Sequence, residues 1–506
     1  MDLLNELVFI VMQRPPRDLN TLLSPTSKMR YFFDLLMHGE VTTEVDAAQR
    51  IYGSSSKDKR YLMLKRNLIN KLTDIVLSTE YFDKSNYHSI RFECEKELTV
   101  AAKLLTQNVF HNAERILQRI LNLSQHFQLV DVELSCLKLY RRIASMKGDN
   151  AEIIRIGEQL EILHTLSGQI DKSQEWVELL QSRTRYFIGK SRIIEQEAES
   201  YADTIDGWMI STPNVFLHLN LTHIRTIQLL QTNNAEMLKH HVGLFNSLLS
   251  SNIYLSTPSL ILQLHYYQTL LFRMEGNLYK MRKSVEECMN LSDYKAFNRF
   301  TIQALHFDLL IKENNLAEAG RVLLEVKKQP QFNLIYEPDK SGWAIRKAYL
   351  FYALLSQDDY AGIESFTPEY MRRIDINALG NSCRSISKDK QGYNTMLMLI
   401  RVILMMEHHL DELHNEAENI RVYYYRHLRN ENCDRTKIFS RALYKLLQGD
   451  FNAREVGANI SEFNRRLAEL TKHQITDMAE LIPYQRLGEM VIKRIKILTK
   501  TEEYRN

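Results

Sequence analysis

A turn that recurs about every 40 residues is the feature that most constrains the fold of this chain. Its clearest copy runs from Asn314 to Ala319, between two segments with the apolar periodicity of helices. A similar turn followed by a similar helix start occurs at eight further reference residues: Asn108, Gly148, Gly189, Asn233, Gly276, Asp358, His408 and Gly449. Successive reference residues lie 38 to 50 residues apart, and a period in this range is typical of helical repeats.

The residue types in this register explain how each unit folds. Every reference residue is Gly, Asn, Asp or His, the types that enter the left-handed backbone region most cheaply at the end of a helix. The residues five and nine positions later, such as Ala319 and Leu323, are mostly small or apolar and lie on one helix face. Each unit is therefore predicted to be a helical hairpin that buries its apolar face only by stacking on its neighbours.

Composition agrees with an all-α chain. Among 506 residues there are only 17 glycines and 9 prolines, too few for the many turns of sandwiches and barrels. Hydrophobic residues make up 44% and charged residues 25%, as in ordinary globular proteins. The formal net charge of +3 provides no global field for binding nucleic acid, so a basic site has to be local.

Three segments carry a resemblance to a known family. They read KENNLAEAGRVLLEV (Lys312–Val326), RMEGNLYKMRKSVEEC (Arg273–Cys288) and LLQGDFNAREVGA (Leu446–Ala458). This pattern resembles the divergent, tetratricopeptide-like helical repeats and covers most of residues 95–465. The period is longer than the standard repeat of about 34 residues. The resemblance implies a right-handed α-solenoid of about nine hairpins that holds other proteins or peptides.

Changes in composition suggest four segments. Residues 1–95 are predicted to form a small helical head, and residues 96–366 a first block of the solenoid. Residues 367–392 are polar, rich in Ser and Asn, and lack a helical stripe, which predicts a connecting loop. Residues 393–506 are expected to form a second block that ends in capping helices.

The head admits two interpretations. Two short helices, a turn and a longer basic helix have the order of a helix-turn-helix, and residues 78–92 are expected to supply a β-hairpin wing. The residues predicted to contact DNA phosphates in this winged-helix-like head are Lys59, Arg60, Lys65 and Arg66. Alternatively, these charges are the solvated face of an amphipathic helix whose leucines, including Leu62, Leu68 and Leu72, face inward.

The resemblance also implies a binding surface. In tetratricopeptide-like arrays the first helix of each hairpin lines a concave groove, and counting back from the reference turns gives the residues expected there. They are Lys138, Arg142, Asn220, His223, Gln263, Tyr266, Arg273, Asp308 and Lys312. Their mixture of Arg, Lys, Asn, Gln and Tyr suits the backbone and carboxylates of an extended peptide.

Motifs for catalysis are absent from the sequence. It contains no Gly-rich phosphate loop, no GxSxG elbow and no CxxC pair, so we expect a non-enzymatic protein without a cofactor. The His, Asp and Glu residues from Glu407 to His414 do not have the spacing of a metal site. Tyr423, Tyr424 and Tyr425 lie between basic residues, but on a regular helix they point in three directions and form no single stacking platform.

The five cysteines are far apart and odd in number, which predicts unpaired, buried thiols and a cytoplasmic location. The first residues predict neither a signal peptide nor a membrane span. The expected function is a protein- or peptide-binding scaffold. The alternatives are a transcriptional regulator with a DNA-binding head and a structural subunit of a larger assembly, and the sequence leaves the partner and the oligomeric state open.

Overall fold

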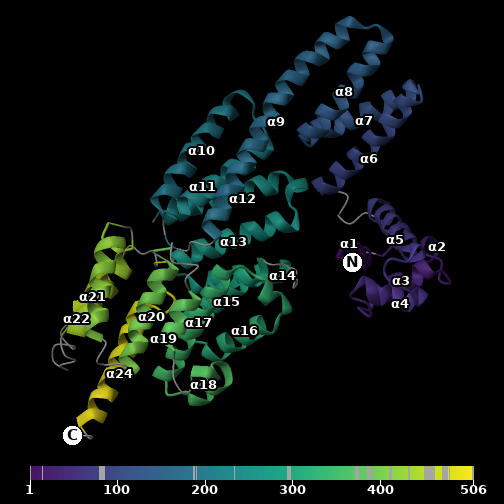
Figure 1. The fold of residues 1–506 in the computed structure, drawn as a ribbon. Helices are drawn as coiled ribbons and strands as arrows, with labels where there is room; N and C mark the ends of the chain where they lie inside the picture. The colour runs from purple at the N-terminus through teal and green to yellow at the C-terminus, as the bar shows by residue number, and fades with distance from the viewer. Residues whose placement is uncertain are drawn as a thin grey trace. The chain divides into compact units, whose positions relative to one another are not determined.

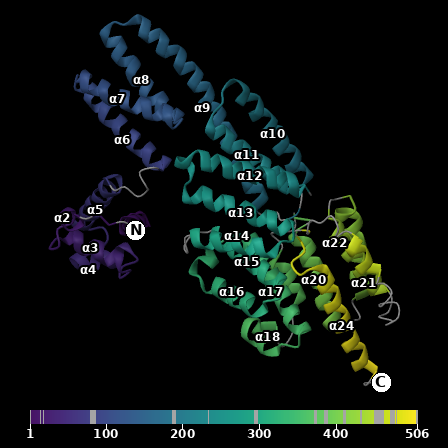
Figure 2. The same cartoon turned by 180° about the vertical axis from the view of Figure 1, so that it is seen from behind.

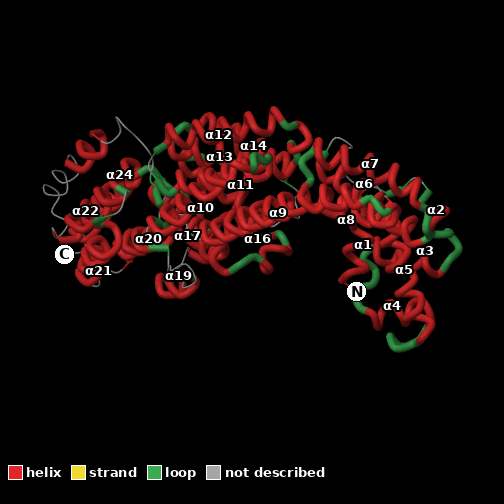
Figure 3. Tube along the Cα trace, turned by 90° about the horizontal axis from the view of Figure 1, so that it is seen from above, coloured by secondary structure: helices red, strands yellow, loops and turns green. Residues whose placement is uncertain are grey.

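The computed structural model divides the chain into two compact units, residues 1–123 and 124–506. The residues that it describes are 2–13, 15–16, 18–78, 86–185, 189, 191–232, 234–292, 298–370, 375–383, 389–390, 392–408, 413–430, 433–448, 462–469, 477 and 479–503. Every regular element in these ranges is a helix, which confirms the all-α prediction (Figure 3). No helix in them combines the length and the apolar composition that a membrane span needs.

The first unit consists of helices, and those within residues 2–78 share one core. The helices are α1 (Asp2–Gln13), α2 (Leu19–Leu22), α3 (Lys28–Met37), α4 (Glu44–Tyr52), α5 (Lys59–Ser78), α6 (Tyr87–Thr106) and α7 (Phe110–His126), and the unit ends within α7. Helices α1, α3, α4 and α5 pack on one another. Their core is centred on side chains with no exposed surface: Phe32, Phe33, Tyr61, Leu68 and Leu72.

Local signals fix these helices where the sequence suggests. The Ser27 hydroxyl accepts a hydrogen bond from the backbone N–H of Arg30 at 3.1 Å and starts α3, and Thr43 does the same for α4. Gly53 ends α4 with φ of 63°, a conformation that glycine adopts without strain. In α5, Leu68 and Leu72 face inward as expected, whereas Leu62 is 45% exposed because Tyr61 takes the buried position beside it.

Two expectations for this part of the chain need correction. The β-hairpin wing over residues 78–92 is wrong for the described residues, because Ser78 ends α5 and Tyr87–Phe92 form the first turns of α6. Residues 79–85 lie outside the described residues. The boundary expected at residue 95 falls inside α6, and the first unit continues to Leu123, within α7.

The second unit is a succession of helices joined by short turns (Figure 1). They are α8 (Val130–Lys147), α9 (Asn150–Arg185), α10 (Arg192–Ser211), α11 (Val215–Leu230), α12 (Ala235–Ser251), α13 (Pro258–Met274), α14 (Leu278–Leu291), α15 (Asn298–Lys312), α16 (Leu316–Lys328), α17 (Glu337–Ser356), α18 (Tyr360–Phe366), α19 (Ile376–Ser382), α20 (Tyr393–His408), α21 (Leu413–Tyr423), α22 (Asp434–Gln448), a helix over residues 462–469, and α24 (Tyr484–Glu503). Short 3-10 turns occupy Ile253–Leu255, Pro330–Leu334 and Pro368–Tyr370, and Tyr424–Leu428 form a π-helical turn after α21.

Neighbouring helices of the second unit pack in chain order. Helices α13 to α17 follow one another side by side in both views (Figures 1 and 2), and each contacts the next. Alternate helices also stack, since α9 packs on α11, α15 on α17 and α16 on α18. A helix with contacts on both sides buries a wide apolar stripe, and this stacking brings side chains from several helices to one surface.

The turn register predicted from the sequence is visible in the backbone. Left-handed φ angles of 57° to 74° occur at Asn108, Gly148, Gly276, Asn314 and Asp358. In each case the next helix, α7, α9, α14, α16 or α18, begins two residues later. The side chains five residues after the reference position are fully buried at Ala113, Leu238, Met281 and Ala319. The sequence pattern therefore marks real helix ends and one buried helix face.

Other members of the register differ from the expectation. The unit at Gly148 is irregular, because α9, which packs on α8 across this turn, continues for 36 residues and Ile153 on it is only half-buried. His408 is the last residue of α20 instead of a turn residue. Asn233 and Gly449 lie outside the described residues.

The predicted connecting loop does not separate two cores. Residues 367–392 contain the short helix α19, started by the Asp375 carboxylate, which accepts a hydrogen bond from the Ala378 N–H at 2.8 Å. One hydrophobic core, extending from Phe300 to Ile495, includes residues from both sides of this segment. The two solenoid blocks expected on either side of residues 367–392 therefore share a core.

Helix α24 lies against the C-terminal ends of earlier helices. Arg486 donates to the backbone carbonyls of Ile311 and Lys312 at the end of α15, and Lys493 donates to the carbonyl of Ser356 at the end of α17, at 2.7 Å. Cationic side chains stabilise helix C-termini, where carbonyls have no partner within the helix. The C-terminal helix thus closes the ends of α15 and α17.

Candidate functional site

A cleft of about 700 Å³ in the second unit is the main candidate site. Its walls come from α9, α11, α13, α15 and α17 and from Tyr393 at the start of α20. Among the described residues, the aromatic side chains that line it are Tyr266, Tyr267, Phe300, Tyr336, Trp343 and Tyr393. A cleft of this size with aromatic walls and a few polar groups has the composition of a ligand-binding site.

Helix α13 places the central wall of the cleft. Pro258 starts this helix, and the preceding Thr257 hydroxyl accepts a hydrogen bond from the Leu260 N–H at 3.2 Å. Its inner residues recur three and four positions apart, so Gln263, Tyr266 and Arg273 reach the cleft from one side of the helix. Three residues predicted from the sequence to face a groove are thereby brought together.

A buried ion cluster forms one end of the cleft. The Asp308 carboxylate on α15 accepts two hydrogen bonds from the Arg346 guanidinium on α17, at 2.7 and 3.2 Å. It also lies 3.2 Å from the Arg273 guanidinium on α13. The three side chains are 5% exposed or less, so the cluster joins three helices away from water.

Burial and charge act in opposite directions in this cluster. Burial favours the neutral form of Asp308, but the adjacent Arg346 and Arg273 outweigh it and lower the pKa of the carboxyl below its ordinary value. Burial likewise opposes the charge of Arg346, yet Asp308 raises the pKa of its guanidinium. Asp308 and Arg346 therefore carry charge at neutral pH.

Tyr393 and Trp343 flank the same guanidinium. The Arg346 Cζ lies 5.6 Å from the Trp343 ring centroid and 5.8 Å from that of Tyr393. Asp389 holds Tyr393 in place by accepting its backbone N–H at 2.8 Å, and the same carboxylate accepts the N–H of Gly189 at 3.1 Å. The cleft wall thus includes a guanidinium placed between two aromatic rings.

His223 on α11 lies behind the cleft. It is 6% exposed and its Nδ1 is 3.1 Å from the Tyr267 hydroxyl. Burial lowers the pKa of the imidazole to about 4, so His223 is neutral at physiological pH. Asn220, one turn earlier, is buried as well and donates to the Ser173 hydroxyl at 2.8 Å. Both residues were expected to face an open groove, but they hold helices together.

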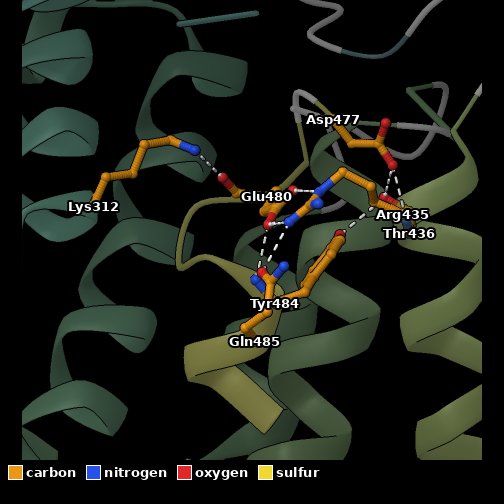
Figure 4. Close-up of polar contacts among 7 residues, drawn as sticks. All are labelled: Lys312, Arg435, Thr436, Asp477, Glu480, Tyr484 and Gln485. Carbon is orange, nitrogen blue, oxygen red and sulfur yellow. Dashed lines mark hydrogen bonds and ion pairs between the residues drawn. The ribbon is translucent and has the colours of Figure 1, made fainter. Parts of the chain in front are cut away.

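Lys312 belongs to a second polar network (Figure 4). Its ammonium donates to the Glu480 carbonyl at 2.8 Å, and the Glu480 carboxylate binds the Arg435 guanidinium at 2.6 and 2.7 Å. Thr436 donates to Asp477 and lies 2.9 Å from the Tyr484 hydroxyl. Burial lowers the pKa of Lys312 to about 8. This network links α15 to α22 and to the start of α24, so Lys312 does not line a groove.

The remaining predicted groove residues lie elsewhere. Lys138 and Arg142 are exposed on α8 and are not among the residues that line the cleft. Trp343, Arg346 and Tyr393 were not predicted as site residues. Trp343 and Arg346 are three residues apart on one helix and so share a face, which is a signal the sequence contains. No local pattern indicates that Tyr393 joins them.

The four residues predicted to contact phosphates lie in the first two turns of α5. Lys59, Arg60 and Arg66 are exposed. Arg60 already pairs with Asp58 at 2.8 Å, and Lys65 pairs with Glu44 at 2.6 Å. Two of the four cations therefore have a carboxylate partner within the head.

The acidic and histidine residues from Glu407 to His414 and the cysteines have structural roles where the structure describes them. Glu407 binds the Arg494 guanidinium of α24 at 2.6 Å, and residues 409–412 lie outside the described residues. All five cysteines are buried and none of them forms a disulfide, as predicted. Burial raises the pKa of the Cys94 thiol to about 11 and that of Cys288 to about 12, so neither is a reactive thiolate at neutral pH.

Comparison of the chain with known protein families, with curated proteins and with solved structures gives no match.

Proposed function

We propose that this chain is a non-enzymatic scaffold that binds a protein or peptide through a tetratricopeptide-like, right-handed array of helical repeats. Support comes from the left-handed turn residues at the predicted period and from the helix that starts two residues after each of them. Support also comes from the stacking of α9 on α11, α15 on α17 and α16 on α18. Each unit of such an array adds one more helix face to a continuous binding surface.

The observation that carries the proposal is the cleft around Tyr266. Alternate helices, from α9 to α17, each contribute to its walls, which is how an array presents one surface to an extended polypeptide. Tyr266 and Trp343 offer rigid apolar surface for a side chain of the partner, and Gln263 offers an amide for its backbone. The ion cluster at the same wall holds two guanidiniums and one carboxylate, and this excess of positive charge favours carboxylate groups of the bound segment.

Variants of the half-buried residues test this assignment. Gln263→Ala combined with Tyr266→Ala removes the amide and the ring while leaving the buried ion cluster intact. The matched control is Tyr279→Ala on α14, whose side chain is 81% exposed and does not line the cleft. Pull-downs from native lysate are expected to lose partners with the double variant and to keep them with the control.

The same recovery from both proteins would show that the cleft is not the binding surface. Thermal unfolding of each variant is the accompanying measurement, because a partner lost together with the fold carries no information on the cleft. Both variants are expected to unfold cooperatively near the wild-type midpoint, since neither residue is fully buried.

A DNA-binding head is the alternative function, and the head's ion pairs argue against it. Arg60 and Lys65 must leave Asp58 and Glu44 before they contact phosphates. We therefore expect no electrophoretic shift of duplex DNA by the full chain at low salt. A shift that weakens steeply with salt and disappears in Lys59→Gln, Arg66→Gln would establish the alternative.

A further inference from the structure

A second cavity, of about 540 Å³, lies near the C-terminal end of the chain and outside the cleft. Its walls come from α21 and the π-helical turn after it, from α22, and from the helix over residues 462–469. The cationic side chains among its described lining residues are Arg421, Arg441, Lys445 and Arg466. Glu462 is the acidic residue among the described lining residues. A concave surface with this charge balance concentrates anions.

Two of these cations, Arg441 and Lys445, do not form an ion pair with a carboxylate among the described residues. Arg421 pairs with Glu418 at 2.6 Å, and Arg466 pairs with Glu462 at 2.5 Å. Arg441 and Lys445, one turn apart on α22, have no carboxylate within 4 Å in the part of the chain that the structure describes. Their surplus charge at one wall is suited to the phosphate groups of a ligand.

The π-helical turn places aromatic surface beside these cations. It is closed by the Arg429 N–H, which donates to the Tyr424 carbonyl five residues earlier at 2.9 Å. Tyr423 does not line the cavity, and its hydroxyl donates to the Lys390 carbonyl. This agrees with the expectation that the three tyrosines point in different directions. Tyr424 and Tyr425, however, both line the cavity, with ring centroids 5.4 Å apart in an edge-to-face arrangement. Turns of this kind often occur at functional sites.

The two rings differ in what they can do for a ligand. Tyr424 is 7% exposed, and the Arg441 guanidinium carbon lies 4.8 Å from its ring centroid. This contact fixes the position of the cation. Tyr425 is 53% exposed, which leaves ring surface available for stacking. The Ser440 hydroxyl on the same wall is buried and has no hydrogen-bond partner among the described residues, which adds an unsatisfied polar group to this wall.

We propose that this cavity binds a mononucleotide, with its phosphates on Arg441 and Lys445 and its base stacked on Tyr425. A base provides the planar surface that matches an exposed tyrosine, and phosphates match paired cations without acids. The cavity volume is in the range of small-molecule sites and suits one nucleotide better than a strand, which needs a continuous basic groove. The site shares no lining residue with the cleft, so this proposal does not rest on the proposed scaffold function.

Isothermal titration calorimetry with the full chain tests the ligand class. ATP and AMP are expected to bind, ATP more tightly because of its additional phosphates, and adenosine and tripolyphosphate each about tenfold more weakly than ATP. Tripolyphosphate binding as tightly as ATP would overturn the stacking of the base. If a single-stranded oligonucleotide of about twelve residues binds more tightly than ATP, the ligand is a nucleic-acid strand and the proposed mononucleotide is wrong. No heat with any of these probes at 1 mM would overturn the site itself.

Variants locate the site on the chain. Arg441→Gln and Lys445→Gln are each expected to weaken ATP binding about tenfold, since each removes a charge-assisted contact. Tyr425→Ala is expected to weaken it by a similar factor, whereas Tyr425→Phe keeps the ring and hence the affinity. Lys437→Gln is the matched control, because Lys437 lies on the same helix but pairs with Asp434 at 2.9 Å. Equal affinity in all five proteins would place binding elsewhere and refute the assignment.

Discussion

Replacing Asp308 by asparagine removes the carboxylate on which the cleft's ion cluster depends. Asp308→Asn keeps the size and shape of the side chain but leaves the guanidiniums of Arg273 and Arg346 without their shared anion. All three side chains are at most 5% exposed, so water cannot replace the lost charge. The change therefore tests whether the helices α13, α15 and α17 are held together by this cluster.

The burial of the ion pair and the length of the second unit determine how far the unfolding midpoint falls. Removing one partner of a buried ion pair costs about 3–5 kcal/mol. An unfolding entropy of about 2.1 cal/mol/K per residue gives about 0.8 kcal/mol/K for a unit the size of residues 124–506. The unfolding midpoint of the second unit is therefore expected to fall by about 4–6 °C.

Thermal unfolding followed by far-UV circular dichroism at pH 7 measures the shift. The control is Glu469→Gln, because Glu469 is 60% exposed and pairs with Arg465 at 2.7 Å. Loss of an exposed pair costs about 0–1 kcal/mol, or about 1 °C here. Equal shifts in the two variants would refute the role given to the buried cluster.

The pH dependence gives an independent check on Asp308. Burial alone would raise the pKa of this carboxyl, but Arg346 and Arg273 lower it below its ordinary value of 3.8. A depressed pKa in the folded state means that the stabilisation is present above pH 3.8 and is lost as the pH falls through the folded-state pKa. The difference between wild type and Asp308→Asn is expected to shrink in acid and to stay constant between pH 5 and 8.

Three further changes have defined outcomes. In Gly320→Ala the new Cβ would meet the Phe366 ring at 2.3 to 2.5 Å, so we expect a loss of about 1–3 kcal/mol in unfolding free energy. The control Gly207→Ala, at an open helix position, should be neutral or stabilising. Urea unfolding of both proteins measures the difference. Burial lowers the pKa of His223 to about 4, so between pH 6.5 and 4 the unfolded chain binds a proton that the folded chain does not. The free energy of unfolding should therefore decrease as the pH falls from 6.5 to 4, and His223→Phe should flatten the plot of unfolding midpoint against pH. Arg486→Met removes the donor to the carbonyls at the end of α15 and should cost about 1–2 kcal/mol in the same urea experiment; an unchanged midpoint would mean that α24 does not stabilise that helix end.

The turn register was predictable because it depends on local backbone chemistry. Asn314 and Asp358 adopt left-handed angles that few residue types accept, and the next helix must begin directly after them. The 36-residue α9 was not predictable in the same way. Gly157 and Gly168 look like possible breaks, but both lie inside the helix, with open space around them. A glycine ends a helix only when the residues around it favour a turn.

The candidate site was predictable only in part because it is made by packing. Gln263 and Tyr266 could be placed by counting back from a turn, since helix geometry fixes which residues share a face. Asp308 was expected to be available to a partner, but Arg346, 38 residues further on, occupies it. Tyr393 joins the cleft from a later helix. Contacts of this kind depend on which helices stack, and no local pattern reports them.

The most direct measurement for the proposed scaffold is site-specific photo-crosslinking from the cleft. A photoreactive phenylalanine analogue is introduced in place of Tyr266, and in a second protein in place of the 81% exposed Tyr279 on α14. Mass spectrometry after irradiation in native lysate is expected to find a polypeptide joined at position 266 and not at position 279. No crosslinked polypeptide at position 266, or the same products from both positions, would contradict binding of a protein or peptide in the cleft.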